Sequence, residues 1–133
     1  MSIVWNDHTM STGDAEIDAQ HKVLITRINE IFDFMRQGRG TEGLPGLLDF
    51  LGNYARLHFA HEEACMNRNR CPAAASNKAA HAEFMTIFGT IRRRLETEGA
   101  NARLVIEAQQ QLSSWITQHI VRTDTQLRPC LRH

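Results

Sequence analysis

The sequence predicts an all-α protein, an antiparallel up-down-up-down four-helix bundle with an N-terminal arm. Four segments, each of about 20 to 25 residues, repeat apolar side chains at three- and four-residue steps, which is the period of an amphipathic helix. None of them shows the alternation that is typical of a half-buried strand. Three short stretches rich in Gly, Pro and Asn separate the segments. Because short connections make consecutive helices antiparallel neighbours, a bundle follows.

The chain is expected to begin with an arm, residues 1–17, in which Trp5 anchors the arm to the bundle. The first helix follows this arm. Its inner face is formed by His21, Leu24, Ile28, Ile31 and Met35. The stretch GRGTEGLPG (38–46) is the first predicted break, because it combines four glycines with a proline.

The remaining helices show the same periodicity. The second helix repeats Leu44, Leu47, Leu51, Tyr54, His58 and Glu62. The third repeats Asn77, His81, Phe84, Phe88, Ile91 and Leu95. The fourth repeats Val105, Ala108, Leu112, Trp115, His119 and Thr123. NRNRCP (67–72) and EGAN (98–101) are the second and third breaks.

Length and composition limit the function classes. The 133 residues suit a single domain, 1–133. Lys plus Arg equals Asp plus Glu, 15 against 15, so we expect no nucleic-acid partner. There is no signal-peptide pattern and no apolar run long enough for a membrane span. Three cysteines are too few for a disulfide framework, so we expect free thiols and a reducing, cytoplasmic setting.

Polar residues interrupt the apolar faces at one level of the predicted bundle. His21 and His81 lie early in their helices, whereas His58 and His119 lie late in theirs. In an antiparallel bundle these four positions meet near one end, where Glu62 also falls. Because buried histidines and carboxylates are costly unless they are paired or bind metal, this convergence predicts a metal site.

The donors suit iron, zinc or manganese, and their number favours a dinuclear site. Iron is the natural occupant if the site carries out oxygen or redox chemistry, which zinc cannot do. Four histidines with Glu62 and Asp124 exceed what one tetrahedral zinc needs, and a carboxylate has two oxygens that can bridge two cations. The pattern is neither the HExxH of a zinc protease nor the Glu-x-x-His of ferritin-like bundles. Asp124 follows His119 by five residues, about 140° around a helix, so the helix must end or bulge before Asp124.

Residues beside the predicted ligands have secondary roles. Asp18, Gln20 or Glu63 could orient the imidazoles from outside. His61 is expected to turn away from the site, since it lies three residues after His58.

Taken together, these motifs resemble the hemerythrin family, and within it the bacterial form called bacteriohemerythrin. The resemblance spans nearly the whole chain. It rests on Trp5, DAQHK (18–22), HFAHEEACM (58–66), NKAAH (77–81) and WITQHIVRTD (115–124), which occur in this order. It implies a four-helix bundle that holds an oxo-bridged, non-haem di-iron centre and binds O2 reversibly.

The same resemblance implies roles for individual residues. His21 and His58 would bind one iron, which keeps an open position for O2, and His81 and His119 would bind the other. Glu62 and Asp124 would bridge the two irons. The O2 pocket would be lined by three residues, Ile116 (where the family usually has leucine), Phe59 and Trp115.

One position departs from the family pattern. The family has His-x-x-x-His on the third helix, but this chain has Asn77 in place of the first histidine. Either the Asn77 amide binds iron directly or a water fills the vacancy. Water is the expected occupant, because asparagine is shorter than histidine. Both irons would then have an exchangeable position.

This vacancy shapes the expected function. Faster autoxidation would suit an O2 or redox sensor, so we expect O2 binding and sensing rather than catalysis. The alternatives are a di-iron peroxidase or NO-reactive enzyme, an O2 carrier or iron store, and a bundle that holds zinc. Peroxide, NO, azide and chloride are further candidate ligands. The chain could be a complete small protein or the sensor domain of a larger signalling protein, with a fused or partner output domain.

Overall fold

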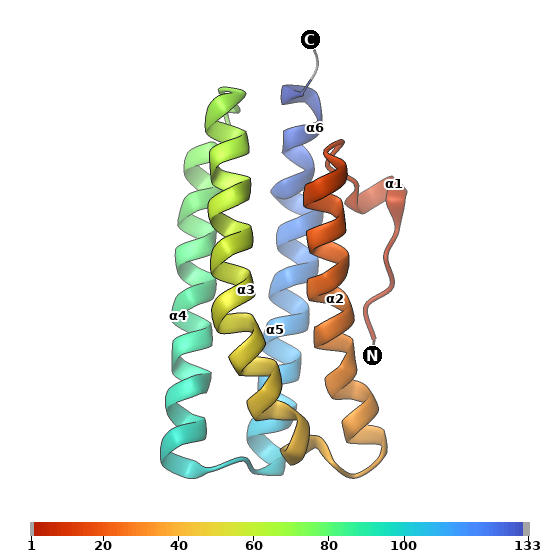
Figure 1. Cartoon of the computed structure of the whole chain (residues 1–133), viewed down its shortest axis with the longest axis vertical. Coiled ribbons are helices and arrows are strands. Elements are labelled where there is room, and N and C mark those ends of the chain that lie inside the picture. Colours follow the sequence, from red (N-terminus) through yellow and green to blue (C-terminus); the bar gives the residue numbers. More distant parts are fainter. Residues whose placement is uncertain (1, 132–133) are drawn as a thin grey trace.

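The computed structural model describes residues 2–131, and its regular elements are all helical. Four long helices run alternately down and up in the view of Figure 1: α2 (Ala15–Arg36), α3 (Gly40–Arg68), α4 (Ala74–Glu98) and α5 (Ala102–Arg122). Three short elements complete the chain: α1 (Asp7–Met10), the 3₁₀ helix η1 (Asp124–Gln126) and α6 (Leu127–Cys130). The predicted antiparallel four-helix bundle is therefore confirmed.

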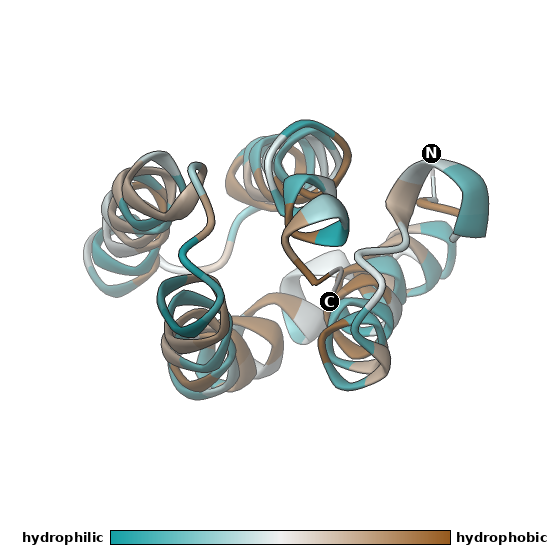
Figure 2. Cartoon of the chain, turned by 90° about the horizontal axis from the view of Figure 1, so that it is seen from above, coloured by the Kyte–Doolittle hydropathy of each residue, from teal (hydrophilic) through white to brown (hydrophobic). Residues whose placement is uncertain are grey.

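The apolar faces of the long helices meet along the bundle axis. Viewed down that axis, the four helices surround a shared interior, and each carries both hydrophobic and hydrophilic sides (Figure 2). One large apolar cluster fills most of the interior, with fully buried contributions from every long helix; these include Leu24, Ile28, Leu48, Leu51, Phe84 and Leu112. This cluster supplies most of the apolar burial that holds the helices at fixed positions around the polar residues.

Helix ends follow local sequence signals. The side chain of Asp14 accepts a hydrogen bond from the backbone N–H of Ile17, and Asn101 caps α5 in the same way. Gly99 ends α4 with φ 78°, a conformation that glycine adopts without strain. The predicted break at 38–46 was too wide, because α3 begins at Gly40 and includes Pro45. The first turns of α3 run at an angle to the rest of that helix (Figure 1).

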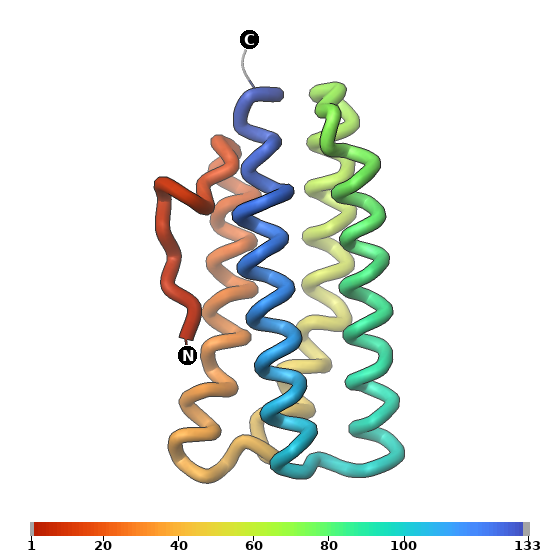
Figure 3. The backbone as a smooth tube through the Cα atoms, turned by 180° about the vertical axis from the view of Figure 1, so that it is seen from behind, coloured from red at the N-terminus to blue at the C-terminus, as the bar shows by residue number. Residues whose placement is uncertain are grey.

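The N-terminal arm lies along α2 (Figure 3). The amide of Asn29 bonds to the backbone of Ile3 in both directions, at 2.8 and 2.7 Å. Trp5 packs against the core, as predicted, and Lys22 lies over its ring. The arm was expected to span 1–17, but the Asp14 cap starts α2 at residue 15, so residues 15–17 are helical. Residue 1 lies outside the described part of the chain.

The cysteine prediction was wrong for two residues. Cys71, in the α3–α4 turn, forms a disulfide with Cys130 in α6. Cys65 is a free, buried thiol. Sequence reasoning missed the pair because 59 residues separate the two cysteines and the fold alone brings them together. The disulfide also removes the cysteine argument for a reducing compartment.

The sequence predicted no segment that could span a membrane. Within residues 2–131, no helix combines the length and the apolar character that a bilayer span requires.

Candidate metal centre

The four predicted histidines meet in one half of the bundle, each supplied by a different long helix. His21 comes from α2, His58 from α3, His81 from α4 and His119 from α5, and none is more than 6% exposed. The convergence follows from the helix directions, since early positions of α2 and α4 lie level with late positions of α3 and α5.

Glu62 lies fully buried between the histidines, and its two oxygens face different partners. Oε2 is 3.1 Å from Nε2 of His21 and 3.7 Å from Nε2 of His58. Oε1 is 3.0 Å from Nε2 of His81. Glu62 reaches this position because it lies one helical turn after His58, on the same face of α3.

Asp124 has the same two-sided arrangement. Its Oδ1 is 3.0 Å from Nε2 of His119, and its Oδ2 is 3.0 Å from Nε2 of His21. The predicted helix end is confirmed, because α5 stops at Arg122 and Asp124 opens η1. The change from α-helix to 3₁₀ helix brings Asp124 to the side of His119, where a continuous helix would have turned it away.

The donor atoms form two groups that share one residue. His21, His58 and Glu62 make the first group, and Glu62, His81, His119 and Asp124 make the second. Within each group the ligand atoms lie within 4.8 Å of one another, and all of these residues are buried. Two adjacent groups with a common carboxylate are the arrangement that a dinuclear metal site requires.

Unpartnered polar atoms test whether these residues fit a metal. Within residues 2–131, Nε2 of His119 and both oxygens of Asp124 are buried without a hydrogen-bond partner. Nε2 and Oδ1 lie 3.0 Å apart, but their geometry is not that of a hydrogen bond. Burying such atoms unpaired costs free energy, and a cation bound between them would remove that cost. Imidazole with carboxylate suits iron, zinc or manganese, so the residues fit.

Burial and the neighbouring carboxylates shift the pKa values of the histidines in opposite directions. For His21, burial lowers the pKa, but Asp124 and Glu62 outweigh it and raise the pKa to about 9. For His58, burial dominates and lowers the pKa to about 3. Burial alone would raise the pKa of the Asp124 carboxyl, yet His119 and His21 hold it well below its usual range. Without metal, the centre therefore keeps a proton on His21 between two carboxylates.

Outer partners fix two of the imidazoles. Nδ1 of His58 lies 2.6 Å from the amide oxygen of Gln20, and Nδ1 of His81 lies 2.8 Å from a carboxylate oxygen of Glu63. Since both partner oxygens are acceptors, each Nδ1 carries a proton, and Nε2 is the nitrogen of each ring that is left to bind a metal. Two of the three predicted orienting residues thus contact an imidazole.

Asp18 and His61 lie outside the centre. Asp18 accepts hydrogen bonds from Ser11 and Thr12 of the arm, so it holds the arm rather than an imidazole. His61 turns away from the centre, as predicted, and Nε2 lies 3.8 Å from Glu16.

Asn77 is fully buried at the centre, one helical turn before His81. Its amide nitrogen donates a 3.1 Å hydrogen bond to Oε1 of Glu62. Its amide oxygen has no hydrogen-bond partner within the described chain. The side chain thus contacts a predicted bridging residue.

Aromatic rings cover the α4 and α5 side of the centre. Phe59 stacks on His81, with ring centroids 3.9 Å apart and an interplanar angle of 11°. Trp115 stacks on His119 at 4.4 Å and 16°. Ile116 is buried in the apolar core at 2% exposure. The sequence suggested a pocket lining for these residues but gave no sign of the stacking, which depends on how the helices pack.

The chain matches known proteins over almost its full length. Residues 12–131 match the family model described as "Hemerythrin HHE cation binding domain". A bacteriohemerythrin of Pseudomonas aeruginosa is 29% identical over 98% of this chain and 82% of that protein. A bacteriohemerythrin of Methylococcus capsulatus is 24% identical over 97% of this chain and 96% of that protein.

Solved structures show the same fold. A wild-type hemerythrin aligns over 97% of both chains with a TM-score of 0.78 at 22% identity. A leucine-to-alanine mutant of hemerythrin aligns over 98% of both chains with a TM-score of 0.79.

Proposed function

The chain belongs to the hemerythrin family, and on this premise we propose that it binds two iron ions and, through them, O2, as a sensor of O2 or redox state. The observation that carries the proposal is the two-sided placement of both buried carboxylates. Glu62 turns one oxygen to His21 and the other to His81, and Asp124 turns one oxygen to His21 and the other to His119. A carboxylate in this position can bridge two cations about 3.5 to 4 Å apart.

The proposed ligand sets follow the two groups of donors. His21 and His58 would hold one iron, His81 and His119 would hold the other, and Glu62 and Asp124 would supply an oxygen to each. When bound, the two irons supply the electrons with which O2 is held. The protein's own part is to keep the donor nitrogens fixed and to limit the access of water.

The contacts of residues around the proposed ligands support this role of the protein. Gln20 and Glu63 hold His58 and His81 in the tautomer that offers Nε2 inward. Phe59 and Trp115 cover His81 and His119 with their ring faces. Phe59 also packs beside His58, with ring centroids 5.8 Å apart, so we assign these two rings and Ile116 to the apolar wall of the O2 pocket.

Asn77 sets this chain apart from a stable O2 carrier. Its amide nitrogen is engaged with Glu62, and its amide oxygen is a weaker and shorter-reaching ligand than an imidazole, so we infer that the iron of His81 and His119 lacks one protein ligand. We assign that position to an exchangeable water. A labile position favours rapid oxidation in air, which suits a sensor whose output partner or fused domain reads the iron state.

The test is the spectrum of the iron-loaded protein after anaerobic reduction and exposure to O2. A sensor of this kind should form an O2 adduct that decays within minutes to the spectrum of the oxidised protein. An adduct that persists for hours would instead favour O2 transport or storage. If O2 caused no spectral change in protein that holds two irons, the proposal would be wrong.

An enzyme is the second candidate, and the Asn77 vacancy favours it as well. Two irons that each keep an exchangeable position could hold peroxide or two NO molecules, and anions such as azide or chloride would compete for the same positions. Turnover of peroxide or NO well above that of free iron would support a peroxidase or NO-reactive enzyme. Equal rates would exclude it.

A further inference from the structure

We propose that the Cys71–Cys130 disulfide is a thiol–disulfide exchange site, and that opening it releases the C-terminal segment that positions Asp124. The disulfide lies outside the residues assigned to iron and O2. Its coupling to the metal centre, though not its opening, rests on the proposed function.

The first argument for the proposal is the position of the disulfide. The α3–α4 turn and the C-terminal segment lie at the same end of the bundle (Figures 1 and 3). Cys130 lies only six positions after Asp124, and both sulfur atoms lie 3.4 Å from the backbone oxygen of Gln126, in η1. The disulfide therefore fixes the segment directly after Asp124 to the turn that joins the two helices carrying Glu62 and His81.

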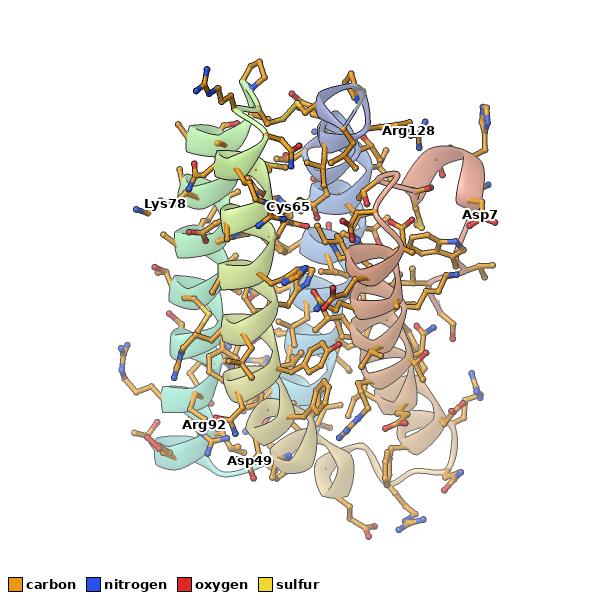
Figure 4. The ribbon with its side chains drawn as sticks, turned by 45° about the horizontal axis from the view of Figure 1, so that its top comes forward. Asp7, Asp49, Cys65, Lys78, Arg92 and Arg128 are labelled. Carbon is orange, nitrogen blue, oxygen red and sulfur yellow. A yellow bond between two sulfur atoms is a disulfide. The ribbon has the colours of Figure 1, made fainter. Side chains whose placement is uncertain are left out.

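The other interactions that hold this segment to its neighbours are non-covalent. Its two helices, η1 and α6, have three and four residues, too few to be stable alone. Leu127 is fully buried in a small cluster with Ile17, Met66 and Cys65, and Arg128 bonds to the backbone of Ser11. Figure 4 shows Cys65 near this end of α3, far from the Asp49 and Arg92 pair. Apart from the peptide backbone through Thr123, the disulfide is the only covalent link between the segment and the bundle within the described chain.

The second argument for the proposal is that a small thiol can reach the disulfide from the solvent. Cys71 is buried, but Cys130 is partly exposed. Both line a surface pocket of about 390 Å³, together with Arg70, Pro72 and Pro129. A small thiol can enter a pocket of this size, and a cationic side chain at its wall favours the thiolate forms that exchange requires.

The chemistry uses two equivalents of a small thiol or one dithiol. A thiolate attacks the sulfur of Cys130, the S–S bond breaks, and Cys71 leaves as a thiolate that takes a proton. A second thiolate then attacks the mixed disulfide and releases Cys130. Two thiols become one disulfide, and the protein gains two electrons and two protons.

The first experiment measures the release itself in the metal-free chain of residues 1–133. Peptide mapping should find Cys71 joined to Cys130 and Cys65 free. After treatment with reduced glutathione or dithiothreitol, amide hydrogen exchange at residues 124–130 should rise about tenfold or more, while the helix centres stay protected. A disulfide that resists reduction in the folded protein, or exchange that stays equal after reduction, would overturn the proposal.

Variants distinguish the effect of opening the Cys71–Cys130 disulfide from general effects of the reductant on the protein. Cys130→Ser should show the faster exchange without any reductant. Cys65→Ala, which keeps this buried position apolar, should behave as wild type and still respond to glutathione. We do not substitute Cys71, because it is buried and its loss could unfold the turn.

A second experiment tests the coupling with Zn²⁺, which glutathione does not reduce. Zn²⁺-loaded Cys130→Ser should lose metal to a chelator about tenfold faster than Cys65→Ala. Equal release, with exchange at 124–130 still raised, would overturn the coupling while leaving the exchange site in place. A chain that bound no metal in either form would contradict the proposed function but not the exchange site.

Discussion

At the scale of single residues, the missing histidine is the most informative feature. Asn77 is buried beside Glu62 and donates to the oxygen that also faces His81. The sequence located this departure, but it could not show which way the amide points. That orientation depends on Glu62, which lies on another helix.

The first prediction restores the family's ligand. Asn77→His should slow oxidation of the reduced, O2-exposed protein by about tenfold and tighten metal retention, because a third imidazole replaces an exchangeable water. The absorbance of the oxidised form over time measures the rate. Ala79→His, on the exposed side of α4, is the control and should change neither quantity. An unchanged oxidation rate in Asn77→His would refute the role given to the vacancy.

The second prediction concerns the outer partner of His81. Glu63→Ala removes the acceptor that holds its Nδ1 proton, so metal affinity should fall by about 10- to 100-fold. A competition titration against a chelator measures the affinity. Glu83→Ala removes an exposed carboxylate from α4 and should leave it unchanged. If both variants bound metal equally well, the contact between Glu63 and His81 would not contribute to metal affinity.

The third prediction is a pH dependence of the metal-free protein. The pKa of His21 is raised from 6.5 unfolded to about 9 folded. The stabilisation is therefore fully present below pH 6.5 and is lost as the pH rises through about 9. The free energy of unfolding should fall over this range, by at most about 3 kcal/mol for a shift of this size.

Urea titrations at several pH values measure this loss. The metal-loaded protein is the control, since metal replaces the proton on His21 and the alkaline loss should disappear. Identical pH profiles with and without metal would contradict this assignment.

At the scale of elements, helix ends position the ligands. Asp14 starts α2 seven residues before His21, and the end of α5 at Arg122 lets Asp124 turn inward. The need for α5 to end before Asp124 followed from helical geometry alone. The start of α2 and the true length of α3 were not predicted, because a cap and an early proline act through local backbone contacts that periodicity does not reveal.

The fourth prediction tests the cap of α2. Asp14→Ala removes the hydrogen bond to the backbone of Ile17 and should lower the free energy of unfolding by about 1 kcal/mol. Asp14→Asn keeps an acceptor and should lose much less. Chemical denaturation of both variants measures the difference. Equal losses would mean that the charge of Asp14, rather than the cap, supports the helix.

At the scale of the whole molecule, the bundle brings distant residues together. The level argument placed His21, His58, His81 and His119 at one end of the interior, and the structure confirms that convergence. Neither the Cys71–Cys130 disulfide nor the stacking of Phe59 on His81 could be predicted from the sequence. Both depend on how neighbouring helices pack, and no periodicity within one helix encodes that.

The central claim is that two metal ions share Glu62 and Asp124, and the metal-to-chain ratio tests it most directly. Anaerobic titration with Fe²⁺, followed by removal of unbound metal and elemental analysis, should give two irons per chain. Glu62→Ala should fall well below two, because it loses a donor to both groups. Glu16→Ala, an exposed glutamate on α2, should keep two. One iron or none in the wild-type protein, or two in Glu62→Ala, would contradict a shared dinuclear centre.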